Sequence, residues 1–118
     1  MWYFVVPDVV FGQDALSHLA ELKGTLAFIV TDKNIVKLGL IDKVKEQLWQ
    51  AEIQATVFDE VEPDPSLKTV QEGVAQMNRC GPDLVIGVGG GSVMDAAKAM
   101  RVQYERPDIK PEEQFILW

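Results

Sequence analysis

The chain has 118 residues, of which 47% are hydrophobic and 25% are charged, the length and make-up of one globular domain with its own core. Its 18 acidic and 11 basic residues give a net charge of -7, which argues against nucleic acid or an anionic membrane as a partner, because both are bound chiefly through positive charge. A single cysteine, Cys80, excludes an internal disulfide, and no signal peptide or membrane-length apolar run is evident, so we expect a cytoplasmic protein.

The N-terminal residues 2–11 are rich in β-branched and aromatic side chains and predict two short strands that meet at a turn or bulge. Pro7 argues against a central strand, so we expect residues 1–11 to form an edge strand or hairpin. An exposed edge can pair with another chain, which makes this segment a candidate homodimer contact. The short amphipathic helix that follows contains the lone histidine, His18, which projects away from the leucines and is expected to be solvated rather than a metal ligand or a catalytic base.

The middle of the chain alternates between buried strand patterns and amphipathic helix patterns. Gly39 could kink or split the first helix, and Ser66, after two prolines, is the expected N-cap of the second. This alternation predicts a right-handed, doubly wound α/β domain with a mostly parallel sheet. Strands are expected at 25–31, 53–61 and 84–88, and helices at 34–51, 67–80 and 92–104. Residues 106–118 are expected to be a polar connection and an apolar tail, so that 1–118 is one domain.

The third predicted strand runs into Gly89, Gly90 and Gly91, and helical spacing resumes at Ser92. Glycines let a ligand approach the backbone, and the first turn of a helix offers unpaired N–H groups at the positive end of its dipole. These features are typical of an anion site. The alternative is a tight strand-to-helix turn whose glycines serve only packing.

Two aspartates follow the other predicted core strands, Asp32 after the first and Asp64 after the second. Because the carboxyl ends of parallel strands meet at one edge of a sheet, both are expected near the glycine turn, which favours a nucleotide as the ligand. In the standard dinucleotide fingerprint the glycine turn precedes the acidic residue, whereas here Asp32 comes first. A plain version of that fingerprint is therefore excluded.

The stretch 89–98 resembles the GGGSxxDxAK signature of the iron-containing (group III) alcohol dehydrogenases, and 29–33, 38–40 and 62–65 are similar to other N-terminal landmarks of that family. The resemblance extends over about residues 6–107. It implies the N-terminal, Rossmann-like NAD(P)-binding domain of a dehydroquinate synthase-like fold. Glycerol dehydrogenases and dehydroquinate synthases share the architecture but usually vary Ser92 or the residues after it, which disfavours them.

The resemblance also implies roles for single residues. Asp32 matches the acid that binds the adenosine ribose, where a carboxylate repels a 2′-phosphate and so favours NAD over NADP. Asp64 matches a position near the adenine that is often Asn in relatives, and Asp95 matches the acid of the signature near the nicotinamide side. The pyrophosphate cradle corresponds to Gly90, Gly91, Ser92 and Val93. Two structural alternatives stay open: Asp32 as an N-cap of the next helix, and Asp95 with Lys98 as a surface pair.

Members of this family are longer, with a helical C-terminal domain in which one Asp and three His hold Fe²⁺ or Zn²⁺, the Lewis acid for hydride transfer. The present sequence has one histidine and no such ligand set, so we expect neither a metal site nor a catalytic residue in it. The resemblance implies the dinucleotide-binding part of an NAD-dependent alcohol dehydrogenase that is not catalytic by itself. The alternative is a stand-alone, non-catalytic nucleotide-binding or interaction module.

Overall fold

The structure is a computed structural model, and it describes residues 3–4, 8–10 and 24–105. Within these residues the chain forms one sheet of five strands in the order β1-β2-β5-β3-β4. The strands β2, β5, β3 and β4 run parallel, and β1 pairs with β2 in the antiparallel sense. The strands are β1 (Tyr3–Phe4), β2 (Asp8–Val10), β3 (Leu26–Val30), β4 (Gln54–Phe58) and β5 (Leu84–Gly87).

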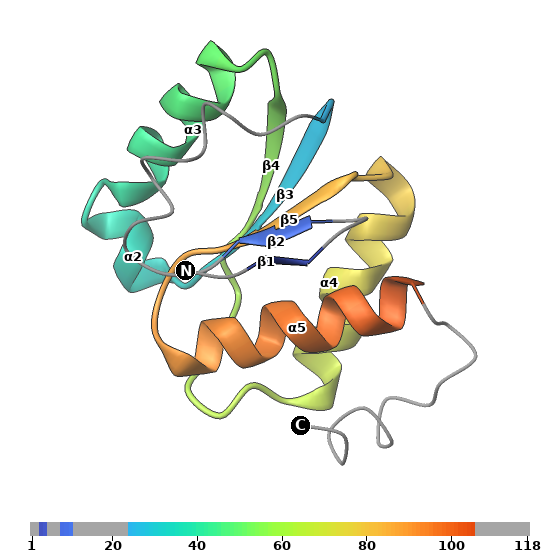
Figure 1. Ribbon diagram of the computed structural model, residues 1–118. Coiled ribbons are helices and arrows are strands. Elements are labelled where there is room, and N and C mark those ends of the chain that lie inside the picture. Colours follow the sequence, from blue (N-terminus) through green and yellow to red (C-terminus); the bar gives the residue numbers. More distant parts are fainter. Residues whose placement is uncertain (1–2, 5–7, 11–23, 106–118) are drawn as a thin grey trace.

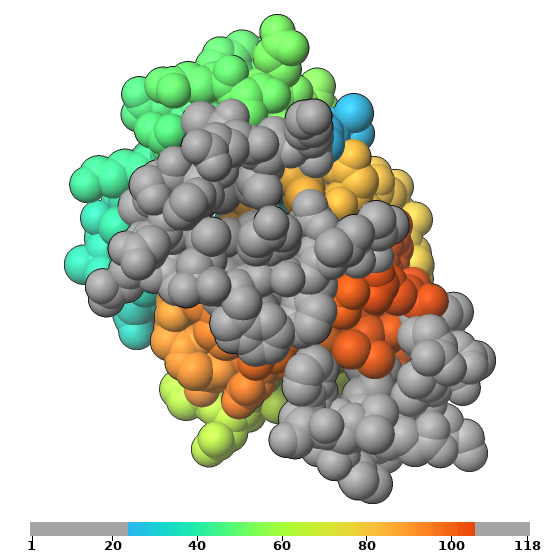
Figure 2. Space-filling view, viewed as in Figure 1, coloured from blue at the N-terminus to red at the C-terminus, as the bar shows by residue number. Residues whose placement is uncertain are grey.

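Helices lie on both faces of this sheet, which confirms the predicted doubly wound α/β fold (Figure 1). In the space-filling view, α3 forms the upper edge of the visible face and α5 lies below it (Figure 2). Among the described residues, no helix has the length and hydrophobicity needed to cross a lipid bilayer. The helices are α2 (Lys33–Lys37), α3 (Leu40–Gln50), α4 (Leu67–Cys80) and α5 (Gly91–Glu105).

The core is divided between the two faces of the sheet, because successive side chains of a strand point to opposite sides. Along β3, Phe28 and Val30 pack with α4 and α5, where Met77 is fully buried, whereas Ala27 and Ile29 pack with α3. All four strand residues are completely buried. Both faces of β3 are therefore covered, as its continuous apolar run predicts.

Of the two outcomes expected at Gly39, a kink or a split of the helix, the structure shows the split, and one strand ends earlier than predicted. Gly39, with φ of 79°, splits the predicted helix at 34–51 into α2 and α3, because a left-handed residue cannot continue a right-handed helix. The second core strand ends at Phe58, three residues before the predicted end. Thr31 N still donates to Phe58 O, but the carbonyl oxygen of Thr31 accepts from Val61 N and not from Glu60 N, so the regular ladder stops.

The N-terminal segment confirms the two predicted short strands, because β1 and β2 pair in the antiparallel sense, with Tyr3 opposite Val10 and Phe4 opposite Val9. The expected edge position is confirmed for β1 and is wrong for β2, which lies between β1 and β5. Pro7, which argued against a central strand, lies outside the described residues, and the ladder to β5 begins at Asp8. The predicted helix around His18 and the segment 106–118 also lie outside the described residues.

The connections place a switch in strand order beside β3. From β3 the chain passes through α2 and α3 to β4 on one side, and from β4 it passes through α4 to β5 on the other side of β3. In open α/β sheets, ligands bind outside the carboxyl ends of the strands at such a switch point. The site is therefore expected where the chain leaves β3 and β5.

Candidate functional site

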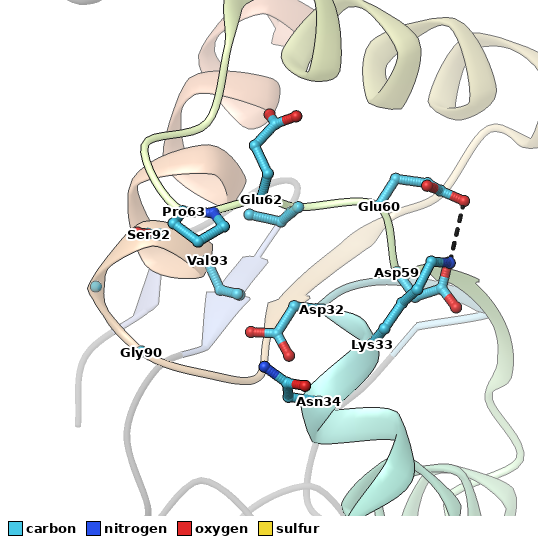
Figure 3. A pocket seen from close by; sticks show the side chains of 12 residues that line it. Asp32, Lys33, Asn34, Asp59, Glu60, Glu62, Pro63, Gly90, Ser92 and Val93 are labelled. Atoms are coloured by element: carbon cyan, nitrogen blue, oxygen red, sulfur yellow. Dashed lines mark hydrogen bonds and ion pairs between the residues drawn. The ribbon is translucent and has the colours of Figure 1, made fainter.

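A pocket of about 520 Å³ opens beyond the carboxyl ends of β3, β4 and β5. Its walls come from three segments: residues 32–34 at the start of α2, residues 59–63 after β4, and residues 90–93 at the start of α5 (Figure 3). The three segments are far apart in the sequence, and the parallel sheet brings their strand ends to one edge. The pocket thus lies at the switch point of the sheet.

Thr31 holds the three strand ends together. It is completely buried, and its hydroxyl donates a hydrogen bond of 2.8 Å to the carbonyl oxygen of Val88, just before the glycine turn. Its backbone N–H donates to Phe58 O at 2.9 Å, and its carbonyl oxygen accepts from Val61 N at 3.4 Å. One residue therefore fixes how the segments after β3, β4 and β5 face one another.

Asp32 lies on the pocket wall and also caps α2. Its Oδ1 accepts a hydrogen bond of 2.8 Å from the backbone N–H of Ile35, so the structural alternative of an N-cap is confirmed. Of the two carboxylate oxygens only Oδ1 takes part in a hydrogen bond among the described residues, and the carboxylate points into the space in front of Gly90 and Val93 (Figure 3). The cap fixes the side chain and leaves Oδ2 available to a ligand.

In the glycine turn, the backbone at Gly89 requires a glycine, whereas Gly90 and Gly91 border open space that a ligand could occupy. Gly89 has φ of 152°, and a Cβ there would lie 2.8 Å from Cγ2 of the buried Val93. At Gly90 and Gly91 a Cβ would meet no atom within 4 Å, and neither residue has a positive φ. A larger side chain at either position would extend into open space in front of α5.

The first turn of α5 supplies the donors for an anion. Met94 N donates to Gly90 O at 3.0 Å, the first helical bond, so the N–H groups that precede it have no acceptor within the helix. Val93 is buried and Ser92 partly exposed, and both line the pocket. The open cradle at Gly90 and Gly91 and the helix N-terminus behind it fit a phosphate-sized group.

Lys33 bridges two walls of the pocket. Its Nζ lies 3.4 Å from Asp59 Oδ1 and 3.4 Å from Glu60 Oε1 (Figure 3). The hydrogen bond and the charge of Asp59, followed by those of Glu60, raise the pKa of Lys33 above its usual value. Lys33, Asp59 and Glu60 were not among the predicted site residues. The rule that ligands bind beyond the carboxyl ends of strands identifies them once β4 is known to end at Phe58.

Glu62 lines the pocket and also stabilises the loop between β4 and α4. Its Oε1 accepts hydrogen bonds from the hydroxyl of Thr69 and, at 2.9 Å, from the N–H of Ser66. These bonds, that of Thr69 first, lower the pKa of Glu62 below its usual value. Ser66 Oγ in turn accepts from Thr69 N at 3.2 Å, which confirms Ser66 as the N-cap of α4.

The predicted site residues fall into two groups. Asp32, Gly90, Gly91, Ser92 and Val93 line the pocket together. Asp64 and Asp95 are exposed and are not among the lining residues. Asp64 directly follows the lining residue Pro63 and has φ of 52°, and Asp95 lies in the second turn of α5. Contacts of Asp64 with an adenine and of Asp95 with a nicotinamide stay predictions.

The charges around the pocket are divided between its sides. Asp32, Asp59 and Glu60 place carboxylates on the side of α2 and β4, and the positive end of the α5 dipole lies on the opposite side. Carboxylates accept hydrogen bonds from hydroxyl groups and repel phosphates, whereas the helix N-terminus attracts phosphates. Among the described residues, no group of three or more His, Cys, Asp or Glu side chains could hold a metal ion. The arrangement suits a ligand with hydroxyl groups at one end and phosphates at the other.

A model of the iron-containing alcohol dehydrogenase family matches residues 7–116 of the chain. The chain is similar to aldehyde-alcohol dehydrogenase 2 of Entamoeba histolytica, with 46% identity over 110 residues that make up 91% of this chain and 13% of that protein. It is 42% identical over 110 residues to the NADPH-dependent butanol dehydrogenase of Clostridium saccharobutylicum, covering 92% of this chain and 28% of that protein. The crystal structure of an iron-containing alcohol dehydrogenase of Thermotoga maritima matches with a TM-score of 0.73 at 34% identity, over 96% of this chain and 33% of that one. The chain thus spans a third or less of the length of these relatives.

Proposed function

Because this chain belongs to the iron-containing alcohol dehydrogenase family, we propose that its pocket binds the adenosine and pyrophosphate part of NAD. The observation that supports this most is the pairing, across one pocket, of the available carboxylate oxygen of Asp32 with the open N-terminus of α5. Asp32 Oδ2 accepts hydrogen bonds from the ribose hydroxyls. The N–H groups at the start of α5 bind the pyrophosphate, which enters the space in front of Gly90 and Gly91.

The proposed activity of the whole protein is hydride exchange between an alcohol or aldehyde and NAD. The nicotinamide ring of the bound cofactor supplies the hydride chemistry. The described residues of this chain contribute binding and orientation: Asp32 fixes the ribose, the α5 N-terminus fixes the pyrophosphate, and Asp95 is proposed to lie toward the nicotinamide. These residues do not fit a site for Fe²⁺ or Zn²⁺, so we derive no step through a metal and propose that the chain alone binds without catalysing.

The proposed preference for NAD over NADP comes from the side chains around the ribose. The relative from Clostridium saccharobutylicum is named NADPH-dependent, so family membership is compatible with either cofactor. In this chain the carboxylate of Asp32, with those of Asp59 and Glu60 on the same side of the pocket, disfavours a 2′-phosphate by like-charge repulsion.

We also propose that Asp64 lies near the adenine. A separate proposal concerns assembly: the edge strand β1 is a homodimer contact.

Calorimetric titration of the 118-residue chain with NAD, NADP and ADP tests this function. The informative variant is Gly90→Val, because the new side chain would extend into open space and leave the fold intact while filling the pyrophosphate cradle. We expect NAD and ADP to bind the wild type and to bind this variant at least about tenfold more weakly, the loss of roughly 1.4 kcal/mol or more that removal of a charge-assisted contact causes.

The matched control is Gly81→Ala at the C-cap of α4, outside the pocket lining, where φ of 64° strains any residue with a Cβ. This variant should lose about 1 kcal/mol of folding stability and keep the affinity of the wild type for NAD. Absence of heat with all three nucleotides would contradict the proposal and leave the interaction module as the alternative. Alcohol-dependent NADH formation by the chain alone, with iron or zinc added, would contradict its proposed lack of catalysis.

A further inference from the structure

The pocket contains one basic side chain among its described lining residues, and that side chain is already engaged. Lys33 follows Asp32 directly and begins α2, so its ammonium group belongs to the same wall as the proposed ribose site. Its side chain is 64% exposed and long enough to turn toward a phosphate on the neighbouring ribose. A lysine beside a ribose-binding position would ordinarily attract the 2′-phosphate of NADP.

In the structure Lys33 instead lies between Asp59 and Glu60, with both nitrogen–oxygen distances at 3.4 Å. These distances are longer than the 2.7–2.9 Å of strong charge-assisted hydrogen bonds. The carboxylates are also exposed, by 35% for Asp59 and 55% for Glu60. Exposed pairs of this kind add little to folding stability. The main effect of these two ion pairs is therefore to hold the ammonium group of Lys33 in place and to offset its positive charge.

The local charge follows from the same contacts. With Asp32, the wall carries three carboxylates around one ammonium group, so a dianionic phosphate placed there meets net repulsion. Removing the charges of Asp59 and Glu60 would leave one ammonium group and two lining carboxylates, Asp32 and Glu62, of which Glu62 is already hydrogen-bonded to Ser66 and Thr69. Lys33 would then lose both of its charged partners. The same wall would then offer a 2′-phosphate a free cation.

We propose that Asp59 and Glu60 are specificity-determining residues that engage Lys33 and thereby exclude the 2′-phosphate of NADP from the pocket. This inference rests on the proposed nucleotide site. It assigns the choice of cofactor to the segment after β4 as well as to Asp32, and it predicts that the two carboxylates act through Lys33 and not merely through the net charge of the domain.

The test compares the affinities of NAD and NADP for three forms of the chain by calorimetry at low ionic strength. In the double variant Asp59→Asn/Glu60→Gln we expect the NADP-to-NAD affinity ratio to rise about tenfold or more, because the phosphate gains an ammonium partner. Adding Lys33→Met to that variant keeps an unbranched side chain of similar length, removes its charge, and should abolish most of the gain. Raising the salt concentration should also reduce the gain, because the contact is exposed.

The charge-matched control is Asp42→Asn/Glu46→Gln, two exposed carboxylates of α3 that do not line the pocket. It changes the net charge by the same amount and should leave the affinity ratio unchanged. Three results would overturn this inference: an unchanged affinity ratio in Asp59→Asn/Glu60→Gln, a gain that persists when Lys33→Met is added, or a gain of the same size in the control. In each case, NAD binding by the wild type would still support the nucleotide site. Failure of the wild type to bind either cofactor would overturn the proposed function and this inference together.

Discussion

At the scale of single residues, Thr31 is the side chain on which the geometry of the pocket depends most. Its hydroxyl binds the carbonyl oxygen of Val88 before the glycine turn, and its backbone binds both ends of the segment from Phe58 to Val61. It does not line the pocket, so a ligand would not touch it. Its predicted effect on binding is therefore indirect, through the spacing between Asp32 and the start of α5.

Thr31→Val removes the hydroxyl and leaves the carbonyl oxygen of Val88 without this partner. We expect a loss of about 1 kcal/mol in the free energy of unfolding and an NAD affinity about threefold to tenfold weaker, because small displacements of positioning groups weaken a preorganised site. Thr31→Ser keeps the hydroxyl and should bind NAD nearly as the wild type does. Equal affinities of the two variants, measured by calorimetry, would show that the hydroxyl does not position the pocket.

Asp32 combines a structural role and a proposed binding role, and one substitution separates them. Asn caps a helix about as well as Asp, so Asp32→Asn should keep the bond to Ile35 N and change folding stability by only a few tenths of a kcal/mol. The loss of its charge should raise the NADP-to-NAD affinity ratio by about tenfold. A ratio equal to that of the wild type would remove Asp32 from the cofactor choice.

At the scale of elements, the start of α4 depends on the carboxylate of Glu62. Folding lowers the pKa of Glu62 from its usual value of 4.5, because the ionised form accepts bonds from Thr69 and Ser66. The stabilisation is therefore fully present above pH 4.5 and is lost as the pH falls through the lowered pKa of the folded state. The loop that carries the pocket residues 59–63 should loosen in acid for this reason.

Glu62→Gln should consequently be less stable than the wild type at neutral pH, and the difference should shrink as the pH falls below 4.5 and through the lowered pKa of Glu62 in the folded state. Urea unfolding of both proteins across this range provides the measurement. Glu72→Gln, at an exposed position on α4, is the control and should show no such convergence. A stability difference for Glu62→Gln that stays constant with pH would contradict the role of the ionised carboxylate.

The elements also show what the sequence can and cannot predict. The split at Gly39, the cap at Ser66 and the strand-turn-helix at 84–104 follow from local chemistry, and the structure confirms them. The end of β4 at Phe58 depends on how its residues pair with the end of β3 and with Thr31, which is not a local property. For this reason Asp59 and Glu60 were missed as pocket residues, whereas the role of Asp64 stays a prediction.

At the scale of the whole molecule, strand order rather than any single motif creates the site. The chain places β4 and β5 on opposite sides of β3, so Asp32 and the glycine turn leave adjacent strands at the switch point. The alternating pattern predicts a doubly wound sheet but does not reveal that β2 enters it beside β5. Long-range pairing of this kind depends on tertiary packing: the β-branched residues of this segment predict a strand, but they do not reveal which strand lies beside it.

NAD is proposed to bind where residues 32–34 and 90–93 face each other across the pocket. Titration of the ¹⁵N-labelled chain with NAD, followed by the backbone amide resonances, tests it most directly. We predict that the largest shifts occur for the amides of Asp32, Lys33 and Gly90 to Val93, while Thr25 and Asp83, which are hydrogen-bonded to each other at the opposite end of the sheet, do not move. Shifts centred at that opposite end, or none at millimolar NAD, would contradict the account.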